Sequence, residues 1–298
     1  VKRVRMRRRG PPEEVARSAI ALPLTRHLEV LDLMRDPVRL SEHFVRLYAF
    51  VAEVPRNHYQ VMEFLEGPDL FDFIAGREDT LPETQAACIA RQVFTAIDHM
   101  HRRLGAIHRD IKPENFGFAR PLPNEGGPLP QLKLFDLGLS WLLPEAIVDE
   151  TAHNLLTLER AGTPLYMAPE SWDCKFGPAS DIWSAGLITF LLLSLELPFD
   201  LLSARSPMDA VLRRPLTFTS PCWSAVSSEA REFIEGVLQK DPRKRSTTTA
   251  ALASVWLSSP GTCPGMRRAT TTPLPDRSKR EGDSNLWEAA VSFAIMAT

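Results

Sequence analysis

The chain has 298 residues, of which 44% are apolar and 24% are charged, and its formal net charge at pH 7 is -2. This composition excludes disorder throughout, and the small net charge gives no electrostatic reason to expect nucleic acid, whose phosphates need a concentrated basic surface. The most apolar stretch, Leu187 to Leu195, is about half of the ~20 residues that a membrane span requires, so it predicts a buried helix and no membrane partner.

The four cysteines show neither a C-x-x-C spacing nor a dense disulfide framework. Such spacings are typical of metal-thiolate sites and of small secreted scaffolds, so we expect free thiols and a reducing compartment. No secretory signal is visible in the sequence, and we therefore expect the cytoplasm or the nucleus.

Strand and helix signals begin near the N-terminus. Val1 to Val4 reads as a short strand within a basic run, and Tyr59 to Phe64 alternates enough to be a second strand. Thr80 to Glu83 has the sequence of a capping box, which predicts the start of a helix that would end at Gly105. The core face of this helix would carry Ile89, Val93, Ile97 and Met100.

Leu132 to Phe135 is a short apolar strand that delivers Asp136 to a turn, after a loop rich in Pro and Gly. Past Glu170 the pattern is helical throughout. The expected helices are Asp181 to Leu195, Met208 to Leu212, Ser228 to Leu238 and Thr248 to Trp256. From residue 258 to 298 the composition shifts to Thr, Pro, Gly, Ser and charge, which predicts a disordered tail.

Three motifs occur in order along the chain. The first, His108-Arg109-Asp110-Ile111-Lys112-Pro113-Glu114-Asn115, places a base, a cation and a metal ligand at fixed offsets on one loop. Asp136-Leu137-Gly138 and Ala168-Pro169-Glu170 follow. This order resembles the large lobe of a eukaryotic protein kinase. Lys112 resembles the lysine that serine/threonine kinases carry at this place, so the resemblance is to serine/threonine protein kinases.

The resemblance implies an α+β, two-lobed protein-kinase-like fold over residues 1–257. Residues 1–65 would form a truncated small β lobe, and residues 66–257 would form a large, mainly helical C-terminal lobe. Residues 258–298 would be a tail outside the kinase domain.

The resemblance also assigns catalytic roles, with ATP and Mg²⁺ as cofactors. Asp110 would orient the substrate hydroxyl and accept its proton, and Lys112 would reach the transferred phosphate as a point charge. Asn115 and Asp136 would hold Mg²⁺. Leu137 stands where the family usually has phenylalanine and still provides an apolar residue next to the metal ligand.

The segment from Gly162 to Tyr166 is similar to the one that holds a protein substrate around its acceptor, with Thr163 hydrogen-bonded near Asp110 and Lys112. Leu216 to Leu257 looks like the calcium/calmodulin-dependent and calcium-dependent protein kinase group. In that group, acids at the places of Asp69 and Glu114 pair with an arginine three residues before the acceptor, so a preference for Arg-x-x-Ser/Thr is our hypothesis.

Regulation is expected at the activation segment. Arg109 would normally bind a phosphorylated residue there, and Glu159 stands where that phosphate typically sits. Glu159 would then replace the phosphate and leave the enzyme partly active, or be a solvated glutamate with Thr157 as the phosphosite. Two structural carboxylates are also expected: Glu170 paired with Arg245, and Asp181 bracing the catalytic loop from below.

The resemblance is weakest at the start of the chain, where no G-x-G-x-x-G segment occurs. Lys2 is the candidate for the phosphate-binding lysine, and Glu29 for its acidic partner. Met62 looks like the gatekeeper, and Glu63 to Leu65 would offer backbone hydrogen bonds to adenine. The simplest interpretation is a fragment of a working kinase, and the alternative is a pseudokinase that acts as a binding or scaffolding module.

Asn285 to Ala297 could form a short helix in the tail, with an apolar stripe similar to that of a calmodulin target. No Lys or Arg follows Arg280, however, so calmodulin binding is only weakly indicated against a docking helix or a frayed end.

Overall fold

The computed structural model describes residues 2–5, 41–53, 57–123, 127–144, 155–199 and 206–258, with only the backbone described for 2–5, 50–53 and 57–59. The described residues divide into two compact units. One holds 2–5, 45–53 and 57–64, and the other holds 41–44 and the described residues from 65 to 258. Glu29, the predicted tail from 259 onward and the expected helix at 285–297 lie outside the described residues.

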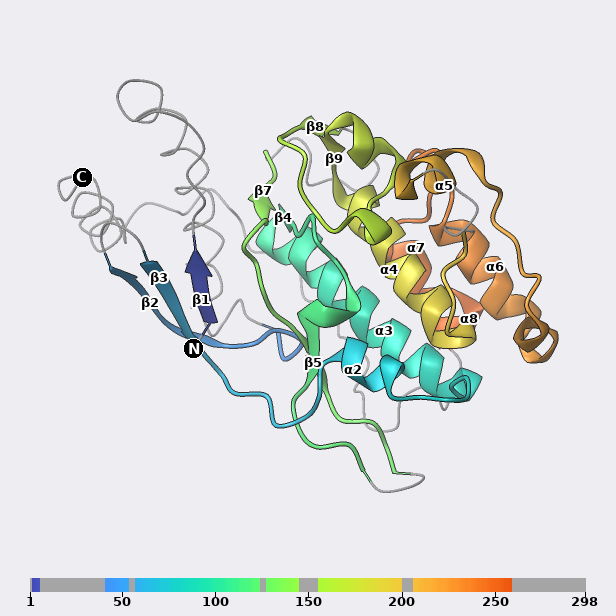
Figure 1. Ribbon diagram of the computed structural model, residues 1–298, viewed down its shortest axis with the longest axis horizontal. Coiled ribbons are helices and arrows are strands. Elements are labelled where there is room, and N and C mark those ends of the chain that lie inside the picture. Colours follow the sequence, from blue (N-terminus) through green and yellow to red (C-terminus); the bar gives the residue numbers. More distant parts are fainter. Residues whose placement is uncertain are drawn as a thin grey trace. The chain divides into compact units, whose positions relative to one another are not determined.

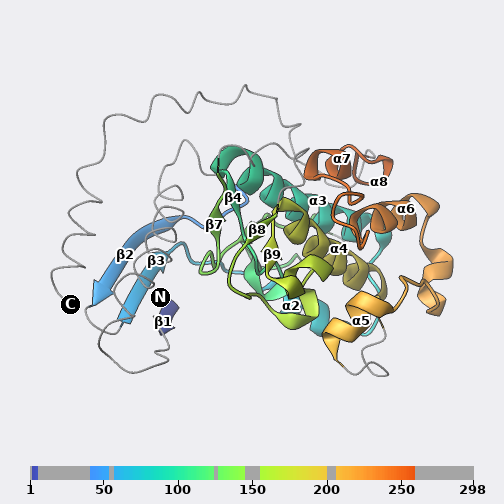
Figure 2. The same cartoon turned by 90° about the horizontal axis from the view of Figure 1, so that it is seen from above.

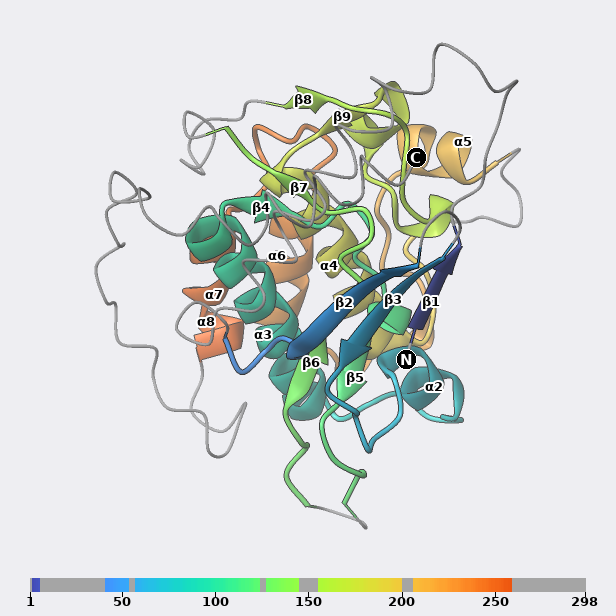
Figure 3. The ribbon, with the colours of Figure 1, turned by 90° about the vertical axis from the view of Figure 1, so that its left-hand side faces the viewer.

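The first unit contains a three-stranded antiparallel sheet. Its strands are β1 (Lys2–Arg5), β2 (Leu47–Glu53) and β3 (Asn57–Met62), and β3 is central, as Figure 3 shows. The register places Lys2 opposite Gln60 and Leu47 opposite Met62. The strands predicted at Val1 to Val4 and at Tyr59 to Phe64 are therefore present as β1 and β3, shifted along the chain by one and two residues.

The second unit is built around two long helices that pack against each other, α3 (Glu83–His99) and α4 (Pro178–Ser194) (Figure 1). The four residues predicted to face the core from this helical segment are all fully buried: Ile89, Val93 and Ile97 on α3, and Met100 directly after it. Helix α4 is buried on nearly all sides, which explains why its sequence is apolar without an amphipathic period. The stretch Leu187 to Leu195 is thus largely a core helix, as expected.

The predicted capping box at the start of α3 is wrong. The helix begins at Glu83, its N-cap is Pro82, and no side chain caps it. The Glu83 carboxylate instead accepts hydrogen bonds from Ser227 and from the indole N–H of Trp256. Ser227 and Trp256 are far from Glu83 in the sequence, so a local pattern could not predict that they would donate hydrogen bonds to its carboxylate.

After α3 the helix continues as a π-helical turn, Met100–Leu104, which Gly105 closes in the left-handed conformation at φ 62°. The N–H of Gly105 donates to the carbonyl of Met100. The predicted stop at Gly105 is confirmed. Glycine suits this position because it has no Cβ, so a positive φ costs it little free energy.

Three short antiparallel pairs position the loops of the second unit. They are β4 (Ala106–Ile107) with β7 (Trp141–Leu142) and β8 (Leu156–Thr157) with β9 (Lys175–Phe176), seen in Figure 2, and β5 (Phe116–Phe118) with β6 (Leu132–Leu134), seen in Figure 3. Strand β6 confirms the predicted apolar strand before Asp136. Strand β9 contradicts the expectation that the chain is wholly helical past Glu170, because residues 175–176 pair with the distant β8.

The remaining helices of this unit are short: α2 (Leu70–Ala75), α5 (Pro207–Arg213), α6 (Ser228–Val237), α7 (Thr248–Leu252) and α8 (Val255–Ser258). Helices α5 and α6 lie where the sequence predicts helices. The single helix expected from Thr248 to Trp256 is broken, because α7 ends at Leu252 with Ala253 as its C-cap, and α8 begins at Val255. The described part of the chain is therefore mixed α and β, mainly helical with small sheets.

None of the helices within the described ranges is long and apolar enough to cross a membrane. Cys174 and Cys222 are free thiols. Cys88 on α3 is disulfide-bonded, so the expectation of free thiols is wrong at that position; sequence spacing alone does not reveal which side chains meet in space.

Candidate active site

The motif around Asp110 lies on a loop between β4 and a 3₁₀ turn at Pro113–Asn115. Two residues near it adopt the left-handed backbone that non-glycine residues avoid, Arg109 at φ 71° and Asp136 at φ 61°. Such conformations persist only where the surrounding contacts over-determine them, and they concentrate at functional loops.

Asp181, near the start of α4, holds this loop from below, as the sequence predicts. Its Oδ2 accepts the backbone N–H of His108 at 2.8 Å, and its Oδ1 accepts that of Arg109 at 2.9 Å. Its Oδ2 also lies 2.8 Å from Nε2 of His101. Burial acts to raise the pKa of Asp181, but the hydrogen bond from His101 and the nearby histidines outweigh it, and the pKa is lowered. The carboxylate is therefore charged and fully engaged.

His108 connects the loop to the strand that leads to Asp136. Its Nδ1 accepts the N–H of Asp110 at 3.3 Å, and its Nε2 lies 3.5 Å from the carbonyl oxygen of Phe135. Burial lowers the pKa of His108, while Asp181, Asp110 and Asp136 act to raise it. Asp110 and Asp136 are thus both close enough to act electrostatically on this one imidazole.

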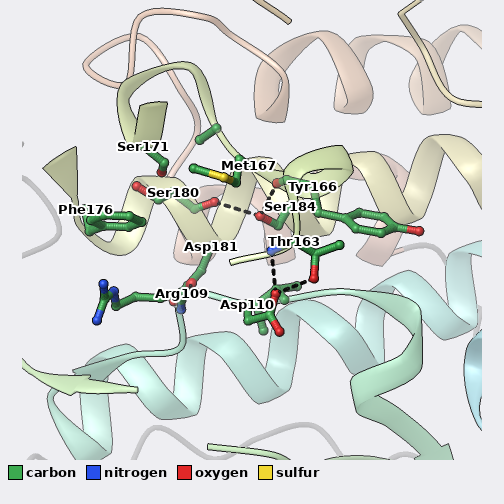
Figure 4. A pocket seen from close by; sticks show the side chains of 12 residues that line it. Arg109, Asp110, Thr163, Tyr166, Met167, Ser171, Phe176, Ser180, Asp181 and Ser184 are labelled. Atoms are coloured by element: carbon green, nitrogen blue, oxygen red, sulfur yellow. Dashed lines mark hydrogen bonds between the residues drawn. The ribbon is translucent and has the colours of Figure 1, made fainter. Parts of the chain in front are cut away.

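Asp110, Lys112 and Thr163 form a closed triangle of polar contacts, and Figure 4 shows the contact between Asp110 and Thr163. The backbone N–H and the hydroxyl of Thr163 each donate to Oδ1 of Asp110 at 2.8 Å. Lys112 Nζ lies 3.0 Å from Oδ2 of Asp110 and donates to the hydroxyl oxygen of Thr163 at 2.8 Å. The carboxylate that could accept a proton is therefore fixed by two donors and lies beside a cation.

Gly162 brings Thr163 this close to the loop. Its φ is +106°, and a Cβ there would lie 2.7 Å from the carbonyl oxygen of Arg109. Beyond Thr163 the chain is tied to α4, because the Ser184 hydroxyl donates to the carbonyl of Tyr166 at 2.7 Å. The segment from Gly162 to Tyr166 is thus anchored to the catalytic loop and to the core helix.

The residues expected to hold Mg²⁺ fit that ion. The Asn115 amide nitrogen donates to the carbonyl of Asp110 at 2.7 Å, which leaves the amide oxygen for another partner. The Asn115 carbonyl accepts the N–H of Phe135 at 3.0 Å, so Asn115 contacts the residue before Asp136. A carboxylate and an amide oxygen are the hard ligands that Mg²⁺ prefers, with phosphate oxygens and water completing its shell. The described residues contain no group of three or more His, Cys, Asp or Glu side chains placed to hold a metal ion by themselves.

Arg109 points away from this triangle, toward Phe176, as Figure 4 shows. Its guanidinium stacks on that ring at 4.6 Å and donates to the carbonyl oxygens of Leu139 and Glu159. The contact with Glu159 is thus made by its main chain. Burial lowers the pKa of Arg109, while the charges of Asp181 and Glu159 act to raise it. Thr157 lies in β8, exposed and opposite Lys175.

The two acids expected to read the substrate lie on neighbouring elements, since α2 packs against the turn at Pro113–Asn115. Asp69 is the N-cap of α2 and accepts the N–H of Asp72 at 2.7 Å. Glu114 has a buried Oε2 with no hydrogen-bond partner among the described residues. Burial raises the pKa of Tyr166, and the charge of Glu114 raises it further. A carboxylate oxygen of Glu114 near Tyr166 is therefore able to accept a hydrogen bond from a ligand.

The residues expected to bind ATP lie elsewhere in the chain. Lys2 is described only as backbone in β1, and Met62 ends β3. The N–H of Glu63 donates to the carbonyl of Arg46 at 2.8 Å, so adenine contacts would have to use other backbone groups of residues 63 to 65. Leu65 packs over Gly117, where a Cβ would lie 2.6 Å from its Cδ1.

The predicted ion pair between Glu170 and Arg245 is confirmed. Arg245 donates to the two carboxylate oxygens of Glu170 at 2.7 and 3.1 Å, with both side chains buried. Ser180 adds a hydrogen bond to Glu170 at 3.0 Å, and Arg245 also donates to the carbonyl of Ala179. The pair ties the segment after Thr163 to the C-terminal helices.

Sequence reasoning did not identify His101 or Ser184. Both lie in helical segments and reach the site only through tertiary contacts, so no motif marks them.

Comparison with known proteins agrees with this geometry. Residues 24–257 match the protein kinase domain family. The match begins after Lys2, so it does not extend to that lysine.

The chain is 35% identical over 225 residues to calcium/calmodulin-dependent protein kinase type I of Schizosaccharomyces pombe, covering 75% of this chain and 62% of that protein. It is 36% identical over 221 residues to type 1B of Rattus norvegicus, covering 74% and 60%. It is 36% identical over 243 residues to calcium-dependent protein kinase 12 of Oryza sativa, covering 80% and 43%. The chain thus spans less than two thirds of the length of each of these relatives.

Proposed function

This chain belongs to the protein kinase family, and on that premise we propose that it transfers the γ-phosphoryl group of ATP to serine and threonine hydroxyls of proteins. The observation that carries the proposal is the triangle of Asp110, Lys112 and Thr163. Its similarity to calcium/calmodulin-dependent and calcium-dependent kinases supports the same reaction class.

Phosphoryl transfer needs mainly positioning and charge neutralisation, because its transition state is loose. Asp110 is oriented by Thr163 and would accept the proton of the acceptor hydroxyl as the bond to phosphorus forms. Lys112, whose Nζ lies beside the Asp110 carboxylate, would stabilise the negative charge on the transferred phosphoryl group. Asn115 and Asp136 would hold Mg²⁺, which supplies Lewis-acid neutralisation of the phosphate oxygens.

We further propose that the protein substrate carries an arginine three residues before the acceptor. The buried, unpartnered Oε2 of Glu114 supports this, since an unpaired buried acceptor is costly until a donor arrives. A guanidinium offers several N–H donors and could engage Asp69 on the neighbouring element as well.

For regulation, we propose that the enzyme is partly active without phosphorylation of its activation segment. Both terminal nitrogens of Arg109 already donate to the carbonyl groups of Leu139 and Glu159, and the Phe176 ring lies under the guanidinium, while its buried Nε has no hydrogen-bond partner among the described residues. The sequence left open whether the Glu159 carboxylate replaces a phosphate or is merely solvated; the hydrogen bond from Arg109 goes to the main-chain carbonyl of Glu159. Binding of calmodulin depends on residues outside the described part, and stays a prediction from the sequence.

The proposal is tested with the full chain, radiolabelled ATP and Mg²⁺, and a peptide with arginine three residues before serine. We expect transfer that Asp110→Asn abolishes and that the control Asp79→Asn, at an exposed aspartate, leaves unchanged. Binding of Mg-ATP that depends on Asp136, without any transfer, would support the scaffolding alternative. Absence of both binding and transfer would overturn the assignment of an active kinase.

A further inference from the structure

The proposed preference for arginine three residues before the acceptor also applies to the chain itself. Within the described residues, such an arginine precedes Thr80, Thr163, Thr217, Ser246 and Thr248. Two further matches, at Thr270 and Thr271, lie outside the described residues. A kinase must bring the acceptor hydroxyl into line with the γ-phosphorus of ATP, so the surroundings of each hydroxyl decide which of them can be used.

Tertiary contacts exclude three of these hydroxyls in the folded chain. The hydroxyl of Thr163 already donates to the catalytic carboxylate of its own chain. Thr248 is fully buried, and its hydroxyl donates to Asp98 at 2.7 Å. Ser246 is half-buried and packs so closely on Gly236 that a Cβ there would lie 2.8 Å from its Oγ. None of these three can enter another active site while the surrounding fold is intact.

Thr80 is exposed, but the charges before it are unsuitable. Glu78 and Asp79 lie between it and Arg77, and they would approach the carboxylates of an active site that reads a basic substrate. The Arg77 guanidinium already stacks on the Phe73 ring at 5.4 Å and donates to the carbonyl of Asp79 at 3.4 Å. Thr80 is therefore a poor acceptor and a suitable control.

Thr217 differs from the others in exposure, backbone and charge. It is exposed and lies in residues 215–219, which follow α5 and form neither helix nor strand. Within the described ranges its hydroxyl makes no hydrogen bond. Arg213 and Arg214, four and three residues before it, are exposed as well, and the backbone becomes extended at Arg214, with φ -80° and ψ 139°. An extended stretch with the proposed arginine spacing is thus presented on the surface.

Contacts on both sides of Thr217 hold this stretch in place. Before it, Lys240 donates to the carbonyl of Arg214. After it, the Phe218 ring packs on that of Trp223 with centroids 4.6 Å apart. The exposed hydroxyl therefore belongs to a fixed part of the surface, where its neighbours contribute positive charge that would stabilise a phosphate once it is attached.

We propose that Thr217 is a phosphorylation site whose kinase is a second copy of this chain. The inference rests on the proposed function and names one of its substrates. The Thr217 hydroxyl oxygen bonds to the γ-phosphorus of ATP held by the second copy, the bond from that phosphorus to the bridging oxygen breaks, and ADP leaves. Asp110 of the second copy takes the hydroxyl proton, and Glu114 of the second copy accepts hydrogen bonds from Arg214.

The test mixes the wild-type full chain with an isotopically labelled full-length Asp110→Asn copy, ATP and Mg²⁺. The labelled copy is the substrate, and its phosphopeptides are identified and timed by mass spectrometry. It is compared with labelled copies that also carry Thr217→Ala, Thr80→Ala, Arg214→Gln or Arg213→Gln, all at exposed side chains. Thermal unfolding checks that each copy is folded. A peptide with arginine three residues before serine is assayed in parallel with the same enzyme.

We expect phosphate at Thr217 of the folded copy. Thr217→Ala should remove this phosphopeptide and most of the phosphate incorporated, whereas Thr80→Ala should leave both unchanged. Arg214→Gln should lower the initial rate at Thr217 by about tenfold or more, because its guanidinium is the group that the acidic residues of the enzyme bind. Arg213→Gln, one residue further from the acceptor, should change that rate by less than about threefold.

The inference is overturned, and the proposed function stands, if the peptide is phosphorylated while Thr217 is not. The same holds if Thr217 is modified only above the unfolding temperature of the labelled copy, since the folded surface would then not present it. Equal losses in Arg214→Gln and Arg213→Gln would contradict recognition through the arginine three residues before the acceptor. If neither the peptide nor the copy is phosphorylated, the proposed function fails and this inference fails with it.

Discussion

Thr163 donates two hydrogen bonds to a single carboxylate oxygen of Asp110, one from its backbone and one from its hydroxyl, both at 2.8 Å. The two residues are 53 positions apart in the chain. The same hydroxyl accepts from Lys112. The acceptor end of the proposed reaction is therefore assembled by a segment far from the catalytic loop, and any displacement of that segment would disorient Asp110.

Removing the hydroxyl should slow transfer. Thr163→Val keeps the backbone bond and the shape but loses the contacts to Asp110 and Lys112, and we expect kcat to fall about 10- to 100-fold. Thr163→Ser, which keeps the hydroxyl, is the control and should stay near wild type. Steady-state kinetics with a serine peptide provide the measurement, and equal kcat for valine and serine would contradict the role.

The acidic oxygen of Glu114 should determine selectivity for arginine. In Glu114→Gln the charge is lost while the volume is kept, so kcat/KM should fall about tenfold or more for a peptide with arginine three residues before serine. A peptide with alanine at that place should be used equally well by both enzymes. A uniform loss on both peptides would show that Glu114 is structural.

The enzyme should be partly active without phosphorylation of the activation segment. Phosphatase-treated protein and Thr157→Ala should both keep measurable activity, because the two terminal nitrogens of Arg109 already donate to main-chain oxygens. Glu159→Gln should do the same, since it leaves the Glu159 carbonyl in place. Loss of activity in Thr157→Ala alone would mean that a phosphate at Thr157 is required.

Stability should fall as the pH drops below neutrality, in part through His43. Burial lowers its pKa from 6.5 to about 4, with His99 and Lys133 also disfavouring the charged form and a backbone hydrogen bond opposing them. Between these two values the unfolded chain binds more protons than the folded one, so the free energy of unfolding decreases with falling pH. The full effect of this one group is about 3 kcal/mol.

His43→Asn isolates that contribution. The asparagine oxygen can accept from Gln131 as Nδ1 of His43 does at 2.6 Å, but it does not titrate. Urea unfolding at pH 7 and pH 4.5 should show a smaller loss of stability in the variant than in the wild type. The same pH dependence in both proteins would rule out His43 as a source.

Breaking the buried pair of Glu170 and Arg245 should destabilise the fold strongly. Glu170→Ala leaves the guanidinium buried without its carboxylate, and we expect a loss of about 3 to 5 kcal/mol in the free energy of unfolding. Arg243→Ala, which removes an exposed pair with Asp241, is the control and should cost under about 1 kcal/mol. Chemical denaturation measures both, and equal effects would contradict the argument.

Several parts of the fold and the site could be predicted from the sequence because they depend on local patterns. The apolar period of α3, the stop at Gly105 and the strand before Asp136 follow from neighbours within a few residues. The order of the motifs around Asp110, Asp136 and Glu170 indicated the family for the same reason, since each role needs fixed offsets on one loop.

Other features were decided only by tertiary structure. The Glu83 carboxylate accepts hydrogen bonds from Ser227 and Trp256 instead of capping its own helix. Arg109 donates to main-chain oxygens instead of to a carboxylate. His101 became part of the site through Asp181, 80 residues away. A buried polar group must take whichever partner packing brings within about 3 Å, and that choice depends on how distant segments pack, which no local pattern specifies.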